Sequence, residues 1–102
     1  MSEPAALFVA LGEVQLHLPG ARSLKEKRHD IRSLIDRLRS RCTVLVLESD
    51  FQDLHQRAGL ALSSLASDAE AARATVARAL DVVHSSFPGV VLEERINVVQ
   101  VR

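Results

Sequence analysis

The segment RSLKEKRHDIRSLIDRLRSR (residues 22–41) is the element around which the rest of the chain is arranged. Ser23 followed three residues later by Glu26 is a capping-box pattern, in which two side chains bond the free backbone N–H groups at a helix start. Five apolar residues then recur with the 3.6-residue period of a helix. They are Leu24, Ile31, Leu34, Ile35 and Leu38. The sequence therefore predicts an amphipathic helix here.

This helix also separates the charges of a formally neutral chain. It holds eight of the 13 Lys and Arg residues but three of the 13 Asp and Glu residues, a net charge of +5, so the remainder carries −5. Such asymmetry favours a polyanionic partner.

Part of this charge forms a row along one edge of the apolar stripe. At about 100° per residue, four cations fall together there. They are Lys25, Arg28, Arg32 and Arg39. A one-sided row of cations is suited to a phosphate backbone. The alternative is an ordinary solvated helix flank, partly neutralised by pairs such as Arg32 with Asp36.

The start of the helix holds two further cations of interest. The turn Pro19-Gly20-Ala21-Arg22 leads into the helix, and its backbone N–H groups with Arg22 can hold an anion. We favour a plain strand-to-helix connection, with Arg22 as an auxiliary anion contact at most. Lys27 falls near the apolar stripe, and we expect its amine to reach water because it is one turn from the helix start.

The totals indicate one domain spanning residues 1–102, with 47% hydrophobic and 25% charged residues, as in ordinary globular proteins. No apolar run approaches the roughly 20 residues that a membrane helix needs. The N-terminus lacks the pattern of a signal peptide. The single cysteine, Cys42, excludes a disulfide framework and a thiolate zinc site. We therefore expect a cytoplasmic protein with no membrane contact and no cofactor.

Three strands are predicted around the basic helix. In residues 5–18 the apolar alternation changes phase at Gly12-Glu13, which predicts a β-bulge. Residues 42–50 are apolar on both faces and are predicted to be buried on both. Residues 57–66 read as a third strand.

The last third of the chain adds a helix and a strand. Ser67-Asp68-Ala69-Glu70 is a second capping-box pattern and opens a helix running to about Ser86. Residues 90–101 form a strand, interrupted or bulged at residues 93–95. The order β-α-β-β-α-β predicts an α+β fold, the ferredoxin-like sandwich, with an antiparallel four-stranded sheet and two helices on one face.

Such a sheet leaves one face uncovered. Apolar residues nevertheless fall on both faces of several strands, as in the neighbours Leu7 and Phe8 or Val98 and Val99. Because a large bare apolar patch is rare on a soluble monomer, we expect a homodimer, or a partner docked on the sheet.

Two blocks, LPGARSLKEKR (residues 18–28) and DFQDLHQRA (residues 50–58), resemble the YlxP-like family, a small bacterial family of unknown function. The resemblance covers nearly the whole chain and implies a ferredoxin-like fold. Members are often encoded near translation-initiation and ribosome-maturation genes, which implies an RNA or ribosome connection by association. It implies no catalytic residue.

The second block is the densest polar cluster. Its carboxylates and His55 could hold a divalent cation, but the spacing matches no strong metal loop, so we expect no metal. We expect Asp50 to cap a short helical turn with Asp53 at its third position, and Arg57 to pair with either carboxylate. A partner contact is a further possibility. It would use Gln52, Gln56 and Arg57.

Four hypotheses about function remain. An acylphosphatase-like enzyme is disfavoured because Asn97, which would orient water, lies in the last strand. A small-ligand regulatory domain would need a pocket at a dimer interface. A protein-interaction module dimerising through its sheet, without a nucleic-acid role, is the main alternative. We favour an RNA-binding or ribosome-associated factor, because positive charge is concentrated on one helix. Its basic helix would bind phosphates and not bases, since aromatic residues for base stacking are scarce.

Overall fold

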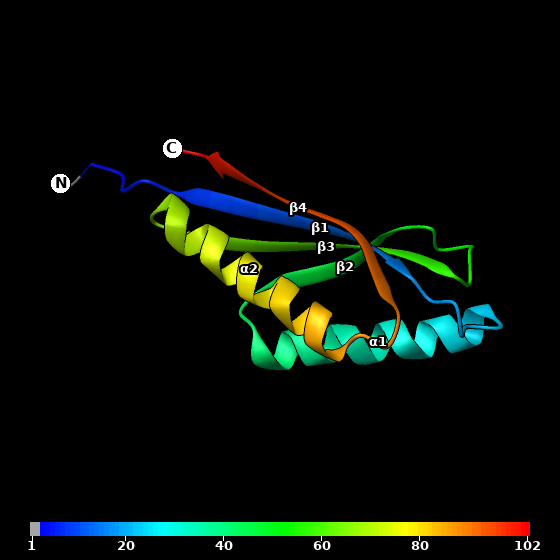
Figure 1. Cartoon of the computed structure of the whole chain (residues 1–102). Coiled ribbons are helices and arrows are strands. Elements are labelled where there is room, and N and C mark those ends of the chain that lie inside the picture. The colour runs from blue at the N-terminus through cyan, green and yellow to red at the C-terminus, as the bar shows by residue number, and fades with distance from the viewer. Residues whose placement is uncertain (1–2) are drawn as a thin grey trace.

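The computed structural model describes residues 3–102. Its elements follow the order β1 (Phe8–His17), α1 (Leu24–Arg41), β2 (Leu45–Asp50), β3 (Arg57–Ala66), α2 (Ala69–Ser86) and β4 (Val90–Gln100). The strands form one antiparallel sheet in the order β2-β3-β1-β4. Both helices cover the same face of this sheet (Figure 1). The predicted ferredoxin-like βαββαβ sandwich is confirmed.

Both helices begin at a side-chain cap. Ser23 caps α1 as predicted, with its hydroxyl accepting a 3.1 Å hydrogen bond from the backbone N–H of Glu26. The cap of α2 is Asp68, one residue later than the Ser67 of the predicted pattern. Its carboxylate accepts a 2.7 Å hydrogen bond from the N–H of Ala71. Side-chain oxygens at this position satisfy donors that the first helical turn leaves free.

The predicted bulge at Gly12-Glu13 is wrong. β1 pairs with β3 residue by residue along its whole length, so its faces alternate without a change of phase. Ala10, Gly12 and Val14 all face the helices and are buried. A Cβ atom on Gly12 would lie 2.5 Å from Val76 Cγ1 of α2. The small residues therefore let α2 approach the strand closely, and the larger Val9 and Leu11 occupy the opposite, open face.

The prediction that residues 42–50 are buried on both faces is also wrong. The strand begins at Leu45, and β2 is an edge strand. Val46 packs towards the helices with 6% of its surface exposed, whereas Leu45 is 78% exposed. The continuous apolar run resembled a central strand, but the strand order leaves one of its faces in solvent.

The last strand carries the irregularity that the sequence indicated. Gln15 pairs with Glu93, but the next residue of β1, Leu16, pairs with Val91. Leu92 is therefore the extra residue of a bulge, immediately before the predicted residues 93–95.

The core lies between the sheet and the helices. It is built from aliphatic side chains of both layers, among them Leu16, Leu38, Leu60, Leu62 and Val76. The two ends of the chain run side by side, and Leu7 exchanges backbone hydrogen bonds with Val101 and Arg102 (Figure 1). Within residues 3–102, no helix has the length and apolar character to cross a membrane.

Candidate nucleic-acid interface

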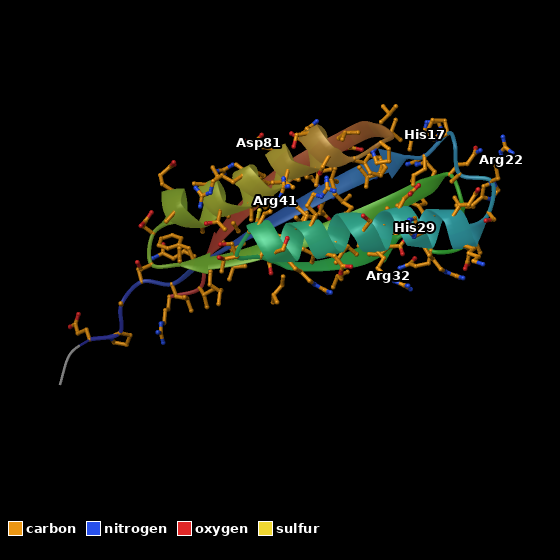
Figure 2. All side chains as sticks on the ribbon, turned by 90° about the horizontal axis from the view of Figure 1, so that it is seen from below. His17, Arg22, His29, Arg32, Arg41 and Asp81 are labelled. Atoms are coloured by element: carbon orange, nitrogen blue, oxygen red, sulfur yellow. The ribbon has the colours of Figure 1, made fainter. Side chains whose placement is uncertain are left out.

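The packing of α1 decides which of its cations reach solvent. Ile31, Leu34 and Leu38 turn towards the sheet and α2 and are buried. The remaining circumference of this helix is exposed or partly exposed, apart from Lys27. Figure 2 shows Arg32 projecting from the outer side of α1, away from α2. The apolar stripe thus orients the basic row outwards, as the helical period predicts.

Three of the predicted phosphate contacts line one groove. Arg28, Arg32 and Arg39 border a hollow of about 340 Å³ between α1 and the edge strand β2. Val46, Leu47 and Glu48 form the β2 side of this hollow, which we call the basic groove. The guanidinium of Arg39 donates a 3.4 Å hydrogen bond to the carbonyl oxygen of Val46 and so joins the two sides.

The arginines of the groove form no ion pair with the described residues. The sequence allowed an Arg32–Asp36 ion pair, but among the residues that the structure describes neither Arg28 nor Arg32 has a carboxylate within 4.0 Å. Asp36 and Glu48 border the same hollow. Glu48, however, is paired with Lys27. The exposed guanidinium groups remain available to an external anion.

Lys25 and Arg22 lie apart from this groove. Lys25 borders a separate hollow of about 450 Å³ with Gly20, Ala21 and His29. Arg22 is exposed at the turn before α1 (Figure 2), and its backbone N–H donates to Glu26 Oε2 at 2.5 Å. The N–H of Ala21 is bonded to the carbonyl of Leu18. The turn has the geometry of a plain strand-to-helix connection, because both of these donors are occupied.

The expectation that Lys27 reaches water is wrong. Its side chain is 1% exposed. Nζ donates to the carbonyl oxygens of Phe51 at 2.7 Å and Arg57 at 3.1 Å, with Gln52 O at 3.4 Å. Glu48 Oε2 lies 3.1 Å from the same nitrogen, as an ion-pair contact without hydrogen-bond alignment. Lys27 therefore binds the β2–β3 connection to α1, an arrangement signalled in the sequence by a lysine on the apolar stripe.

This connection differs from the predicted short helical turn. Phe51 has a positive φ of 62°, and the N–H of Leu54 bonds to the carbonyl of Phe51. Left-handed backbone is costly for a bulky residue. The Lys27 hydrogen bond to Phe51 O helps to hold it.

The predicted partner contacts divide into two kinds. Gln52 and Gln56 are exposed, with their amides donating to Glu48 O and Ala21 O. Arg57 is half-buried, and its guanidinium donates to Gln15 Oε1 at 2.6 Å and lies 4.5 Å from the Phe51 ring centroid. It pairs with neither Asp50 nor Asp53, contrary to expectation. Arg57 is therefore engaged inside the protein, and the two glutamines are the accessible residues of this set.

Other chemistry-bearing residues are dispersed. Within the described residues, no three His, Cys, Asp or Glu side chains gather as a metal site would require. Asn97 pairs with Leu11 in the sheet register and lies on the open face, whereas the Gly20–Arg22 turn follows the end of β1. On the same face, the hydrogen bond and charge of Glu13 raise the pKa of Arg95 above its ordinary value.

Comparison with solved structures supports the fold and adds no activity. A de novo designed protein, Foldit4, matches with a TM-score of 0.51 and 13% identity, covering 94% of this chain and 99% of its own. No curated protein matches in sequence. A family model described as "Protein of unknown function (DUF503)" matches residues 9–96. These residues include every strand and helix except the ends of β1 and β4, so the chain belongs to the DUF503 family of proteins of unknown function.

Proposed function

We propose that this protein binds RNA through the basic groove, by contacts to the phosphate backbone. The observation that carries the proposal is the set of three arginines along one groove, of which Arg28 and Arg32 have no carboxylate partner in the described part of the chain. From Arg28 to Arg39 the helix rises by about 16 Å, at about 1.5 Å per residue. This length accommodates several successive phosphates.

The positions of the aromatic residues support backbone-directed binding. The chain has three Phe residues and no Trp or Tyr. Phe8 packs against the core, Phe87 is buried, and Phe51 lies under the Arg57 guanidinium. Base stacking on exposed aromatic rings, as in sheet-based RNA readers, is therefore not provided by these side chains. Recognition would depend on charge and would weaken strongly with salt.

The ribosome is the partner that the resemblance to the YlxP-like family implies, and a role there would place the protein in the cytoplasm. Lys25 and Arg22 would extend the phosphate contacts beyond the groove towards the start of α1. Gln52 and Gln56 would add amide contacts from the β2–β3 connection. These are auxiliary contacts, because none of the four lines the basic groove.

The test is a charge reversal with a matched control. We expect Arg28→Glu with Arg32→Glu to weaken binding to total RNA and to isolated ribosomal subunits by more than about tenfold at low salt. The slope of the logarithm of the binding constant against the logarithm of the salt concentration should fall in magnitude by about 1.4, since each phosphate contact to a single strand contributes about 0.7. Filter binding over a salt series measures both, and circular dichroism checks that the fold is unchanged.

The control is Arg73→Glu with Arg78→Glu on α2, which changes the net charge by the same amount away from the groove. Equal RNA affinity of the two double variants would refute the basic groove as the binding surface. Wild-type protein that bound no RNA even at low salt would refute RNA binding altogether.

A second candidate function is a protein-assembly module with no nucleic-acid role. It is favoured by the exposed leucines and valines on the open face of the sheet. Absence of RNA binding together with a stable protein–protein complex would select this candidate.

A further inference from the structure

The open face of the sheet carries an apolar patch that follows from the strand register. Val9 of β1 pairs with Leu65 of β3 and with Val99 of β4, so these three side chains form one row. The next row on this face contains Leu11 and Ser63, with Leu45 of β2 opposite Ser63. Leu47 extends the patch along β2. We call these apolar side chains the open-face patch. Its members are Val9, Leu11, Leu45, Leu47, Leu65 and Val99.

The patch is exposed to an extent that contrasts with the other face of the same strands. Leu65 is 68% exposed and Val99 58%, whereas Leu62 on the covered face of β3 is 1% exposed. No element of residues 3–102 covers the patch, because both helices lie on the opposite side (Figure 1). Exposed apolar patches of this kind mark interaction sites in soluble proteins.

The size of the open face matches what a second sheet would cover. β1 and β3 have 10 residues each, β4 has 11 and β2 has 6. At about 3.3 Å per residue and about 4.8 Å between strands, the face measures about 590 Å². Specific interfaces bury roughly 600–1,000 Å² on each partner. The whole face of one copy is therefore about large enough for a stable contact, whereas a narrower contact through the patch alone is not.

The charges on this face also suit a second copy. Beyond the patch, the same face carries the carboxylates of Glu13, Asp50 and Glu93 and the guanidinium groups of Arg57 and Arg95, which sum to −1. Glu13 and Arg95 form an ion pair with 2.6 Å between Oε2 and Nε, and Arg57 is bonded to Gln15. An isologous contact brings each surface against itself, so a charged face would repel its copy. A rim with a net charge of −1, in which Glu13 and Arg95 neutralise each other, repels its copy only weakly.

We propose that two copies of this chain pack open face to open face, with the open-face patch at the centre and the charged residues at the rim. The two-fold axis passes near Ser63 and Leu11, in the middle row of the patch, and the sheets stack about 10 Å apart, as in a β-sandwich. Both α1 helices then lie on the outside of the dimer. The inference stands independently of RNA binding, because the contact shares Leu47 with the basic groove but none of the groove's arginines.

The first test compares two charge substitutions. We expect wild-type protein to have twice the monomer mass by light scattering at micromolar concentration. Leu45→Asp with Leu65→Asp should raise the dimer dissociation constant by at least about 100-fold, because each change occurs twice and leaves a charge in an apolar contact. Both leucines are so exposed in the monomer that the fold tolerates the change.

The matched control is Leu54→Asp, on the β2–β3 connection, where the leucine is 50% exposed but outside the sheet. It should leave the dimer intact, as should the Arg28→Glu, Arg32→Glu variant. Wild-type protein that is monomeric at 100 micromolar (about a hundredfold above the dissociation constant of a typical micromolar complex) would refute the inference. So would equal dissociation of the Leu54 and the Leu45/Leu65 variants.

The second test locates the contact directly. In dimers mixed from isotope-labelled and unlabelled chains, we expect intermolecular methyl contacts from Leu11, Leu45 and Leu65. A dimer whose intermolecular contacts came only from α1, or from backbone pairing along the β2 edge, would refute face-to-face packing even though the mass were doubled.

Discussion

Lys27 and Arg32 are two cations five residues apart on α1, and their environments are opposite. Lys27 is buried and its amine is shared among backbone carbonyls of the β2–β3 connection and the carboxylate of Glu48. Arg32 is exposed and, in the part of the chain that the structure covers, has no carboxylate within ion-pair distance. The same helix therefore uses one cation to stabilise the fold and leaves another free for a ligand. Counting charges on a helix does not separate these two roles.

The largest effect on stability is expected at Lys27. Lys27→Met keeps the length of the side chain but leaves Phe51 O, Arg57 O and Glu48 without their donor. Removing one partner of a buried ionic contact costs about 3–5 kcal/mol. Urea unfolding should show a loss of this size, and amide exchange in residues 51–57 should accelerate. A loss below about 1 kcal/mol would show that Lys27 does not hold the connection.

A smaller loss is expected at Glu48. Glu48→Gln removes the charge but keeps a polar group near Lys27, whose carbonyl partners remain. Because the Glu48 side chain is 22% exposed, we expect the free energy of unfolding to fall by about 1 kcal/mol, which is the usual contribution of one hydrogen bond. In the double variant with Lys27→Met and Glu48→Gln, the two losses of unfolding free energy should not add, since the residues share one contact. Full additivity would mean that the ion pair contributes nothing.

The smallest effect on stability is expected at Arg32. Arg32→Ala removes a side chain that has no ion-pair partner among residues 3–102. Exposed substitutions of this kind change the free energy of unfolding by no more than about 0.5 kcal/mol. The same variant should weaken RNA binding in the filter assay, which would complete the contrast with Lys27. Destabilisation by more than about 1 kcal/mol would place Arg32 with Lys27 as a structural cation.

The elements that were predicted correctly depend on local signals. The Ser23 cap and the apolar period define α1, and the strand at residues 57–66 coincides with β3. The bulge of β4 was placed within a residue of its position at Leu92. Each of these rests on side chains within a few residues of one another in sequence, so a single sequence contains the necessary information.

The errors all involve a contact between distant segments. The orientation of β1 depends on α2, because Val76 approaches Gly12 too closely for any side chain there. The change of phase in the apolar alternation predicted a bulge, but the small residues at even positions, Ala10 and Gly12, face the core without one. Similarly, Lys27 is buried because the β2–β3 connection, 24 residues later, offers it carbonyl acceptors. Neither partner can be recognised from the neighbouring sequence.

The candidate site was predicted in part. The helical period identified the exposed edge of α1 that carries Arg28, Arg32 and Arg39, and the structure brings these three together beside β2. It separates Lys25 from them and engages Arg57 with Gln15 and Phe51. The position of β2 at the sheet edge, which creates the groove, follows from the strand order and could not be read from α1.

The sequence by itself determined the order of the helices and strands and the segregation of positive charge onto one helix, because capping, periodicity and charge are local properties of the chain. Only the tertiary structure decided which cations are free, which face of β1 is covered and which strand lies at the edge. These properties depend on which distant groups approach one another: a carbonyl that satisfies Lys27, or a helix that packs onto Gly12. The free energy of burying a side chain depends on both of the segments that come into contact. The sequence of one segment therefore does not specify it.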